Sequence, residues 1–268
     1  MAHLTRIDIK PGGPTGEFPF SLPLVRHFKP ISLASAVTFF TGENGTGKST
    51  FLEAIASASM LPTAGGEDVE VDESLSGPRL LGDQLRLGWK KRTRRGFFLR
   101  AEDFFRFQHR VNQNQKELGD LANSYTAEME ANPSDAENIA FARGFILGQK
   151  QQLENTYGAN ADARSHGEAF LNFFEKRLIA GGLYLLDEPE APLSPLRQLA
   201  FLALLKQFVA LDCQFIITTH SPILMAFPGA LLLDFNAHPV APISYDDVEH
   251  VALTRAFLNN PEAYLRRL

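Results

Sequence analysis

The stretch "GENGTGKST" at residues 42–50 follows the apolar run "AVTFF" and precedes the helix-like "STFLEAIASA". Gly42, Gly47, Lys48 and Ser49 meet the pattern G-x-x-x-x-G-K-[ST]. Glycines let successive backbone N–H groups converge on an anion, and the helix that begins here adds the positive end of its dipole. The sequence therefore predicts a strand, a phosphate-binding loop and a helix, which together indicate an α/β fold.

We expect this loop to bind a nucleoside triphosphate. Lys48 can reach the β- and γ-phosphates, and the hydroxyl of Ser49 can bind Mg²⁺. An ordinary glycine turn before a helix is the alternative, but it does not explain a lysine and a hydroxyl at these offsets. The residues expected to bind the nucleotide are Gly42, Asn44, Gly45, Thr46, Gly47, Lys48, Ser49 and Thr50.

The composition is that of an ordinary globular protein, with 268 residues, 44% hydrophobic and 21% charged. The net charge of −5 excludes a basic surface that covers the whole molecule and coats DNA, but it allows a local basic patch. No apolar run approaches the roughly 20 residues that a membrane-spanning helix needs. The start of the chain has no secretory signal pattern. We therefore expect a soluble, cytoplasmic protein without a membrane span.

Three regions of the sequence differ in composition and in hydrophobic pattern. Residues 1–101 contain short apolar runs such as "LTRIDI", "FPFSLPL" and "ISLASAVTFF", and we expect them to form strands and the first half of an ATPase core. Residues 102–164 are polar and helix-like, which indicates a helical insertion lobe. Residues 165–268 alternate helical patterns with buried strands. This order predicts a mostly parallel core sheet, an N-terminal antiparallel β portion and a helical insertion lobe.

Two adjacent carboxylates follow the apolar run in "GLYLLDEPE". Asp187 and Glu188 stand at the carboxyl end of this strand, which is the edge where ligands bind in open α/β sheets. Carboxylates there are costly unless they face a cation or water. We expect Asp187 to bind Mg²⁺ together with Ser49, and Glu188 to orient or deprotonate a water molecule. An acidic turn without function is the alternative.

The strand "QFIITTH" ends in His220. A lone histidine is more often structural, but this one closes a buried strand that we expect to lie beside the strand of Asp187. It would then lie at the same edge, where an imidazole can contact the γ-phosphate and the attacking water. Lys48, Glu188 and His220 are the expected catalytic residues.

The segments "GENGTGKSTFLEAIA", "LYLLDEPEAPLS" and "FIITTHSP" resemble the Walker A motif, the Walker B motif with its D-loop, and the H-loop of ABC-type P-loop ATPases. The sequences of these motifs resemble those of SMC-like and DNA-repair-like ATPases, and of small stand-alone bacterial AAA-family ATPases, more than those of transporter subunits. The resemblance implies ATP as the ligand, Mg²⁺ as the cofactor and hydrolysis of a phosphoanhydride bond. It also implies an ATP-dependent homodimer that acts as a switch on a partner or effector protein.

The segment "SHGEAFLNFF" lies where such ATPases carry their signature motif. Ser165, Gly167 and Glu168 match the S-G-G-E version, with His166 in place of the first glycine. The resemblance implies that Ser165 and Gly167 contact the nucleotide of the partner subunit. Ser165 and Glu168 also have the spacing of a capping box, and the two interpretations are compatible. The family's Q-loop glutamine has no assigned counterpart in this sequence.

The run "WKKRTRR" at residues 89–95 contains five cations and Trp89. It could bind nucleic-acid phosphates through Lys90, Lys91, Arg94 and Arg95, with the tryptophan stacking on a base. A solvated hairpin edge is the favoured alternative because the overall charge is negative.

The resemblance associates this kind of ATPase with DNA maintenance and with defence. A nucleotide sensor that binds ATP without hydrolysing it is the main functional alternative. A transporter ATPase subunit is the weaker alternative, because the helical insertion and the sequence of the signature motif are unlike those of transporters.

Overall fold

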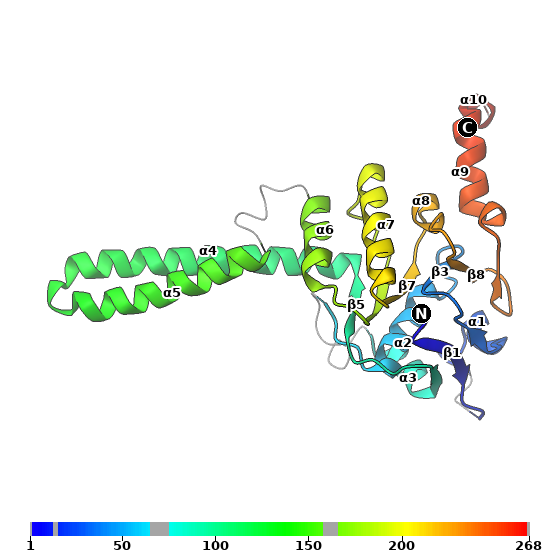
Figure 1. Cartoon of the computed structure of the whole chain (residues 1–268), viewed down its shortest axis with the longest axis horizontal. Helices are drawn as coiled ribbons and strands as arrows, with labels where there is room; N and C mark the ends of the chain where they lie inside the picture. The colour runs from blue at the N-terminus through cyan, green and yellow to red at the C-terminus, as the bar shows by residue number, and fades with distance from the viewer. Residues whose placement is uncertain (1, 13–15, 65–74, 158–165, 267–268) are drawn as a thin grey trace. The chain divides into compact units, whose positions relative to one another are not determined.

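The computed structural model describes residues 2–12, 16–64, 75–157 and 166–266 (Figure 1). The chain forms two compact units. The first comprises residues 1–101 and 178–268, and the second comprises Glu102–Arg177. We describe each unit by itself.

The first unit is built on a central sheet. Within the described residues this sheet has six strands in the order β5-β6-β7-β3-β8-β9. Neighbouring strands are parallel, except that β9 runs antiparallel to β8. The strands are β3 (Val37–Thr41), β5 (Gly96–Arg100), β6 (Leu183–Asp187), β7 (Gln214–Thr218), β8 (Leu231–Asp234) and β9 (Ala241–Pro242). The predicted mostly parallel core sheet is confirmed.

A second, antiparallel sheet has the order β2-β1-β4. Its strands are β1 (Leu4–Ile9), β2 (Ile31–Ser32) and β4 (Leu85–Trp89), so the predicted N-terminal antiparallel portion is also confirmed. The strand expected in "FPFSLPL" is wrong, because this stretch contains turns, a bend and the start of the short helix α1 (Pro23–Arg26). Its prolines have no N–H to donate to a strand ladder, and Pro23 fits the first turn of a helix.

The helix after the phosphate loop, α2 (Lys48–Ser59), packs against the sheet through an aromatic cluster. Phe51 of α2 lies 6.0 Å from Phe40 of β3 and 5.9 Å from Phe235, between ring centroids, and all three side chains are fully buried. This packing fixes the start of α2 relative to the end of β3. The other helices of this unit are α3 (Ser76–Gln84), α7 (Pro195–Ala210), α8 (Pro222–Met225), α9 (Glu249–Asn259) and α10 (Pro261–Leu265), with a 3₁₀ turn at Tyr245–Asp247.

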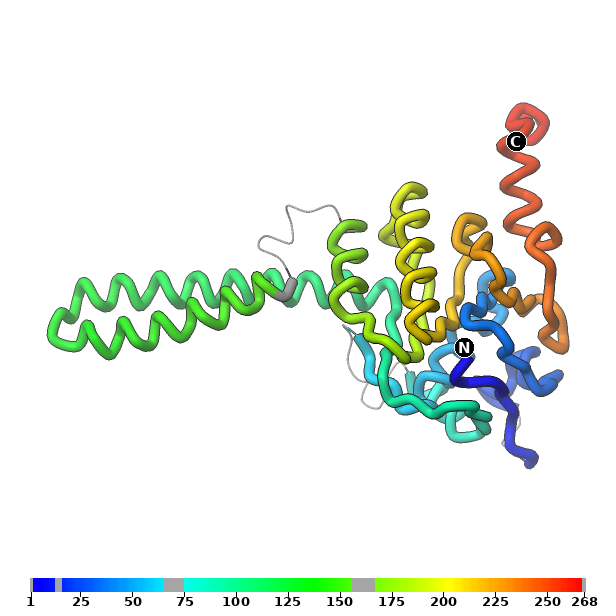
Figure 2. The backbone as a smooth tube through the Cα atoms, viewed as in Figure 1, coloured from blue at the N-terminus to red at the C-terminus, as the bar shows by residue number. Residues whose placement is uncertain are grey.

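The second unit is helical. It consists of most of α4 (Ala101–Ala131), a 3₁₀ turn (Pro133–Asp135), α5 (Ala136–Tyr157) and α6 (His166–Arg177). The helices α4 and α5 run beside each other as a hairpin (Figure 2). The side chain of Lys150 of α5 lies next to Gly119 of α4. None of the described helices of the chain is both long enough and apolar enough to cross a membrane.

The helix α6 belongs to this helical unit, whereas we expected the second half of the core to begin at residue 165. The reason is aromatic packing. Phe170 and Phe173 of α6 lie 4.8 and 5.6 Å from Phe104 of α4, between ring centroids. The helical unit thus extends from Glu102 to Arg177.

A buried glutamine joins the two sheets of the first unit. Oε1 of Gln214, at the start of β7, accepts hydrogen bonds of 2.8 Å from the backbone N–H groups of His3 and Leu4. Its Nε2 donates to the Leu4 carbonyl at 2.9 Å. The side chain is fully buried, so water cannot replace these bonds.

Replacing Gln214 by leucine should lower the free energy of unfolding by about 3 kcal/mol, because the buried N–H groups of His3 and Leu4 lose their acceptor. Urea denaturation would measure the loss. The matched control is Gln207→Leu, which changes an exposed glutamine of α7 and should leave the midpoint nearly unchanged. Equal midpoints for the two variants would contradict this role of Gln214.

Candidate ATP-binding and hydrolysis site

The loop after β3 has the backbone conformation that the glycine pattern predicts. Gly42, Gly45 and Gly47 have φ angles of 138°, 83° and 92°, in the region that favours glycine. A Cβ atom added to Gly47 would lie 2.5 Å from Cδ2 of Leu24, so a larger residue there would require this leucine side chain to shift. The Thr46 hydroxyl donates to the carbonyl of Glu43 at 2.9 Å and closes the loop on itself.

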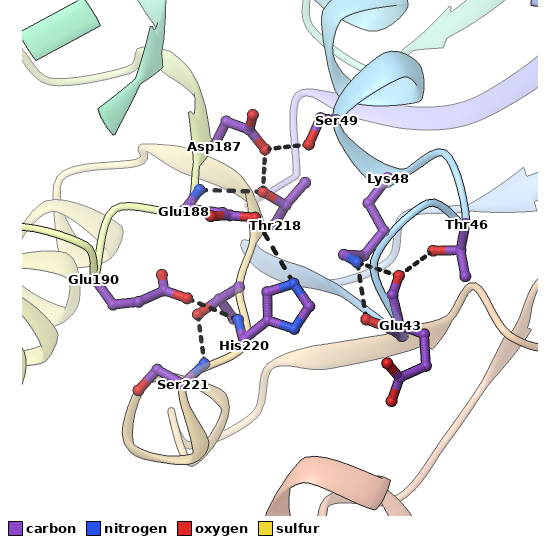
Figure 3. Close-up of polar contacts among 12 residues, drawn as sticks. Glu43, Thr46, Lys48, Ser49, Asp187, Glu188, Glu190, Thr218, His220 and Ser221 are labelled. Atoms are coloured by element: carbon purple, nitrogen blue, oxygen red, sulfur yellow. Dashed lines mark hydrogen bonds and ion pairs between the residues drawn. The ribbon is translucent and has the colours of Figure 1, made fainter. Parts of the chain in front are cut away.

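Lys48 begins α2 and is buried within this loop (Figure 3). Its Nζ donates hydrogen bonds of 2.8 Å to the carbonyl oxygens of Gly42 and Glu43. Burial lowers the pKa of Lys48, and the nearby carboxylates of Glu188 and Asp187 act in the opposite direction. The loop thus holds a cation among backbone oxygens, where incoming phosphate oxygens would be stronger partners.

Ser49 and Asp187 meet across 138 positions of sequence. The Ser49 hydroxyl donates to Asp187 Oδ1 at 3.0 Å, and the Thr218 hydroxyl of β7 donates to the same oxygen (Figure 3). Burial raises the pKa of Asp187, and these two hydrogen bonds oppose the rise. A buried carboxylate in this position is stabilised by a neighbouring cation.

This donor set fits Mg²⁺. Hydroxyl and carboxylate oxygens are ligands that this ion prefers, and it usually takes only one or two protein ligands, with phosphates and water completing the octahedron. Among the described residues, no group of three or more His, Cys, Asp or Glu side chains could hold a metal ion by itself. Ser49 and Asp187 would therefore hold Mg²⁺ together with a nucleotide, rather than in a separate metal site.

Glu188 follows directly in an unusual backbone conformation. Its φ of 49° lies in the left-handed region, where residues other than glycine are uncommon and often mark functional sites. Its N–H is within hydrogen-bond distance of both the carbonyl and the hydroxyl oxygen of Thr218, at 3.1 Å each. The side chain is about half exposed (48%), which leaves its carboxylate accessible to water.

His220 lies beside Glu188, with its Nε2 3.7 Å from Glu188 Oε1 (Figure 3). Its backbone N–H donates to Glu190 Oε1 at 2.7 Å, and its Nδ1 is 2.9 Å from Nε2 of His250. Burial lowers the pKa of His220, and the positive charge of Lys48 adds to this effect. The neutral imidazole is therefore favoured near neutral pH.

The structure thus brings Lys48, Ser49, Asp187, Glu188 and His220 to one edge of the sheet. Asn44 lies exposed in the loop and Thr50 is half-buried in the first turn of α2. Gly167 is buried at the start of α6 in the other unit, and Ser165 lies outside the described residues.

Three residues of the site were missed by sequence reasoning: Thr218, Glu190 and His250. Thr218 could have been found, because it ends the strand expected beside that of Asp187. Glu190 stands two positions after Glu188, where only its contact with the backbone of His220 shows its role. His250 carries no sequence signal, since its contact depends on the placement of α9.

Residues of the basic run 89–95 contact other residues of the first unit. Lys91 Nζ is 3.6 Å from Asp212 Oδ2, and Arg95 Nη1 donates to the carbonyl of Ala180 at 3.2 Å. The Thr93 hydroxyl donates to the carbonyl of Gly181 at 3.0 Å. These contacts favour the interpretation of the run as a surface edge that anchors the connection between β4 and β5.

A family model described as an AAA domain matches residues 19–174. The chain belongs to this AAA domain family. A second AAA domain model, whose description also names the AbiEii toxin and a Type IV TA system, matches residues 170–226. No curated protein matches the chain.

The solved structures to which the chain is similar include SMC head domains and an ABC cassette. The SMC head domain from Thermotoga maritima is 16% identical, with 91% of this chain and 100% of that chain covered and a TM-score of 0.44. The Smc head domain from Pyrococcus furiosus, bound to the C-terminal domain of ScpA, is 12% identical, with 96% and 100% covered and a TM-score of 0.45. A nucleotide-free ATP-binding cassette from an ABC transporter is 17% identical, with 98% and 99% covered and a TM-score of 0.49.

The expected membership of the AAA family is confirmed by the family match. The expected α/β P-loop fold is confirmed by the parallel sheet and the loop between β3 and α2.

Lys48→Ala should abolish ATP binding, because the phosphates lose the cation of the loop. Thermal melts with Mg·ATP would show this: at about one hundred times the dissociation constant, bound ligand stabilises the wild type by about 2.7 kcal/mol. The control Lys206→Ala removes an exposed lysine of α7 and should keep the full shift. An ATP-induced shift in Lys48→Ala equal to that of the control would contradict the assignment of the loop.

Proposed function

We propose that this protein binds ATP with Mg²⁺ and hydrolyses it slowly. The observation that carries the proposal is the Ser49–Asp187 hydrogen bond of 3.0 Å, which joins the start of α2 to the end of β6. It places the phosphate loop directly beside the carboxylate pair, so a phosphate in the loop would lie close to Glu188. Membership of an AAA domain family supports ATP as the nucleotide.

The chain's own residues would divide the work. The loop backbone and Lys48 bind the β- and γ-phosphates and balance their charge. Mg²⁺, held by Ser49 and Asp187, supplies further charge neutralisation when it is bound. Glu188 accepts the proton of a water molecule as this water attacks the γ-phosphorus, and the bond to the β-phosphate oxygen breaks to give ADP and phosphate. His220 contacts the γ-phosphate and keeps the water in line.

We further propose that hydrolysis switches a homodimer between closed and open states. In the closed state, Ser165 and Gly167 of each subunit would contact the γ-phosphate bound by the other. The S-H-G-E segment supports this arrangement, since a helix N-terminus favours an anion. The dimer would close on ATP and open after hydrolysis, and this conformational change would drive a partner or effector protein.

Glu188→Gln should retain ATP binding and lose hydrolysis, with the rate falling by a factor of roughly 10² to 10⁴. The variant keeps the shape of the side chain and cannot accept a proton. It should therefore accumulate as a dimer with Mg·ATP and stay monomeric with ADP. Phosphate release and size-exclusion chromatography with light scattering measure the two effects.

Two double variants serve as controls. Adding Lys48→Ala should keep Glu188→Gln monomeric with ATP, because the nucleotide no longer binds. Adding Ser165→Arg should separate the dimer while ATP still binds, because bulk and charge occupy the partner surface.

Wild-type turnover by Glu188→Gln would remove Glu188 from catalysis. A wild type that binds ATP and releases no phosphate would indicate a nucleotide sensor. An inactive variant that is monomeric with every nucleotide would overturn the dimer switch.

A further inference from the structure

His250, in the first turn of α9, contacts the ring of His220 from outside the predicted motifs. The two rings are edge-to-face, with centroids 4.8 Å apart and planes at 65°. Nε2 of His250 lies 2.9 Å from Nδ1 of His220, which is a hydrogen-bond distance. His250 is half-buried and also lines a small cavity of about 170 Å³ beside Gly42 and Glu43.

The opposite ring nitrogen of His220 decides which histidine donates. His220 Nε2 is buried, has no hydrogen-bond partner among the described residues, and lies 3.7 Å from the Glu188 carboxylate. A carboxylate attracts an N–H group and repels a ring nitrogen lone pair, so the proton of the neutral imidazole is favoured on Nε2. Nδ1 then carries the lone pair, and His250 must be the donor.

We propose that His250 is a positioning residue that donates from its Nε2 to His220 Nδ1 and so holds His220 as the Nε2-protonated tautomer. The Nε2–H group then points toward Glu188 and the nucleotide side of the site, where it can donate to a γ-phosphate oxygen. This inference rests on the proposed ATPase function for its catalytic consequence, but the hydrogen bond itself does not.

The residue His220 is thereby held at two points, one on its backbone and one on its ring. Glu190 binds its backbone N–H at 2.7 Å, and His250 binds its ring. The other charged groups that act on His220 are Glu188, Lys48 and Glu43. None of these three contacts Nδ1 within the described part of the chain, so the orientation of the ring about its Cβ–Cγ bond depends on His250.

The tautomer can be measured without nucleotide, from nitrogen-15 spectra of the histidine-labelled protein at pH 8, where imidazoles are neutral. His220→Gln assigns the signals. We expect the Nε2-protonated form of His220 in the wild type, and in His250→Gln, whose amide N–H can still donate. His250→Phe keeps a ring but no donor, so only Glu188 still favours Nε2, and the share of the Nδ1-protonated form should rise above that of the wild type. Leu253→Ala, at an exposed position of the same helix, is the matched control and should resemble the wild type.

In ATP hydrolysis, His250→Phe should lower kcat about tenfold, which is part of the roughly 10²- to 10⁴-fold that a positioned acid–base group contributes. KM should stay unchanged, because His250 is not part of the phosphate loop. His250→Gln should restore most of the rate. If His250→Phe fails to fold, as far-UV circular dichroism would show, His250→Met replaces it.

An Nδ1-protonated His220 in the wild type would overturn the proposal, and so would a donor-free variant with the tautomer and kcat of the wild type. If the wild type hydrolyses no ATP, the proposed function fails, while the nitrogen spectra still decide whether His250 donates to His220. The two failures are therefore distinguishable.

Discussion

The parallel pairing of β6 with β7 sets Asp187 opposite Thr218, and the site depends on this register. Side chains alternate between the faces of a sheet, so a slip by one residue would turn Asp187 away from Ser49 and Thr218. Thr218 is also paired with Phe40 of β3, one residue before the strand ends and the phosphate loop begins. The register of three strands thus fixes the distance between the loop and the carboxylates.

This register concentrates opposite charges that water only partly reaches. Burial raises the pKa values of Asp187 and Glu190 and lowers that of Lys48, so each group is less stable in its charged form than it would be in water. The aromatic contacts of Phe51 with Phe40 and Phe235 hold α2 in place against this cost. An anion bound at Lys48 and a cation bound at Asp187 would each lower the free-energy cost of burying these charges. In this sense the site favours a phosphate with a bound metal ion.

The parts that could be predicted from the sequence have local causes. Glycine spacing fixes the loop, and apolar runs that end in Asp187 or His220 mark the ends of buried strands. Other features depend on contacts that no local pattern encodes. The helix α6 joins the helical unit because Phe170 and Phe173 contact Phe104. The helix at Pro23–Arg26, by contrast, follows from local prolines. Glu190 and His250 act on His220 from 30 positions away on either side, which only the tertiary structure shows.

These contacts separate two tasks within one site. The groups that would hold the nucleotide, namely the loop, Ser49 and Asp187, are fixed by β3, β6 and α2. The ring of His220 is fixed in addition by α9, through His250. A movement of α9 would thus change the orientation of the His220 ring, while the phosphate loop and Asp187 stay in place. ATP binding and hydrolysis would then respond to different elements of the fold, as the proposed switch requires if it is to hold ATP until hydrolysis begins.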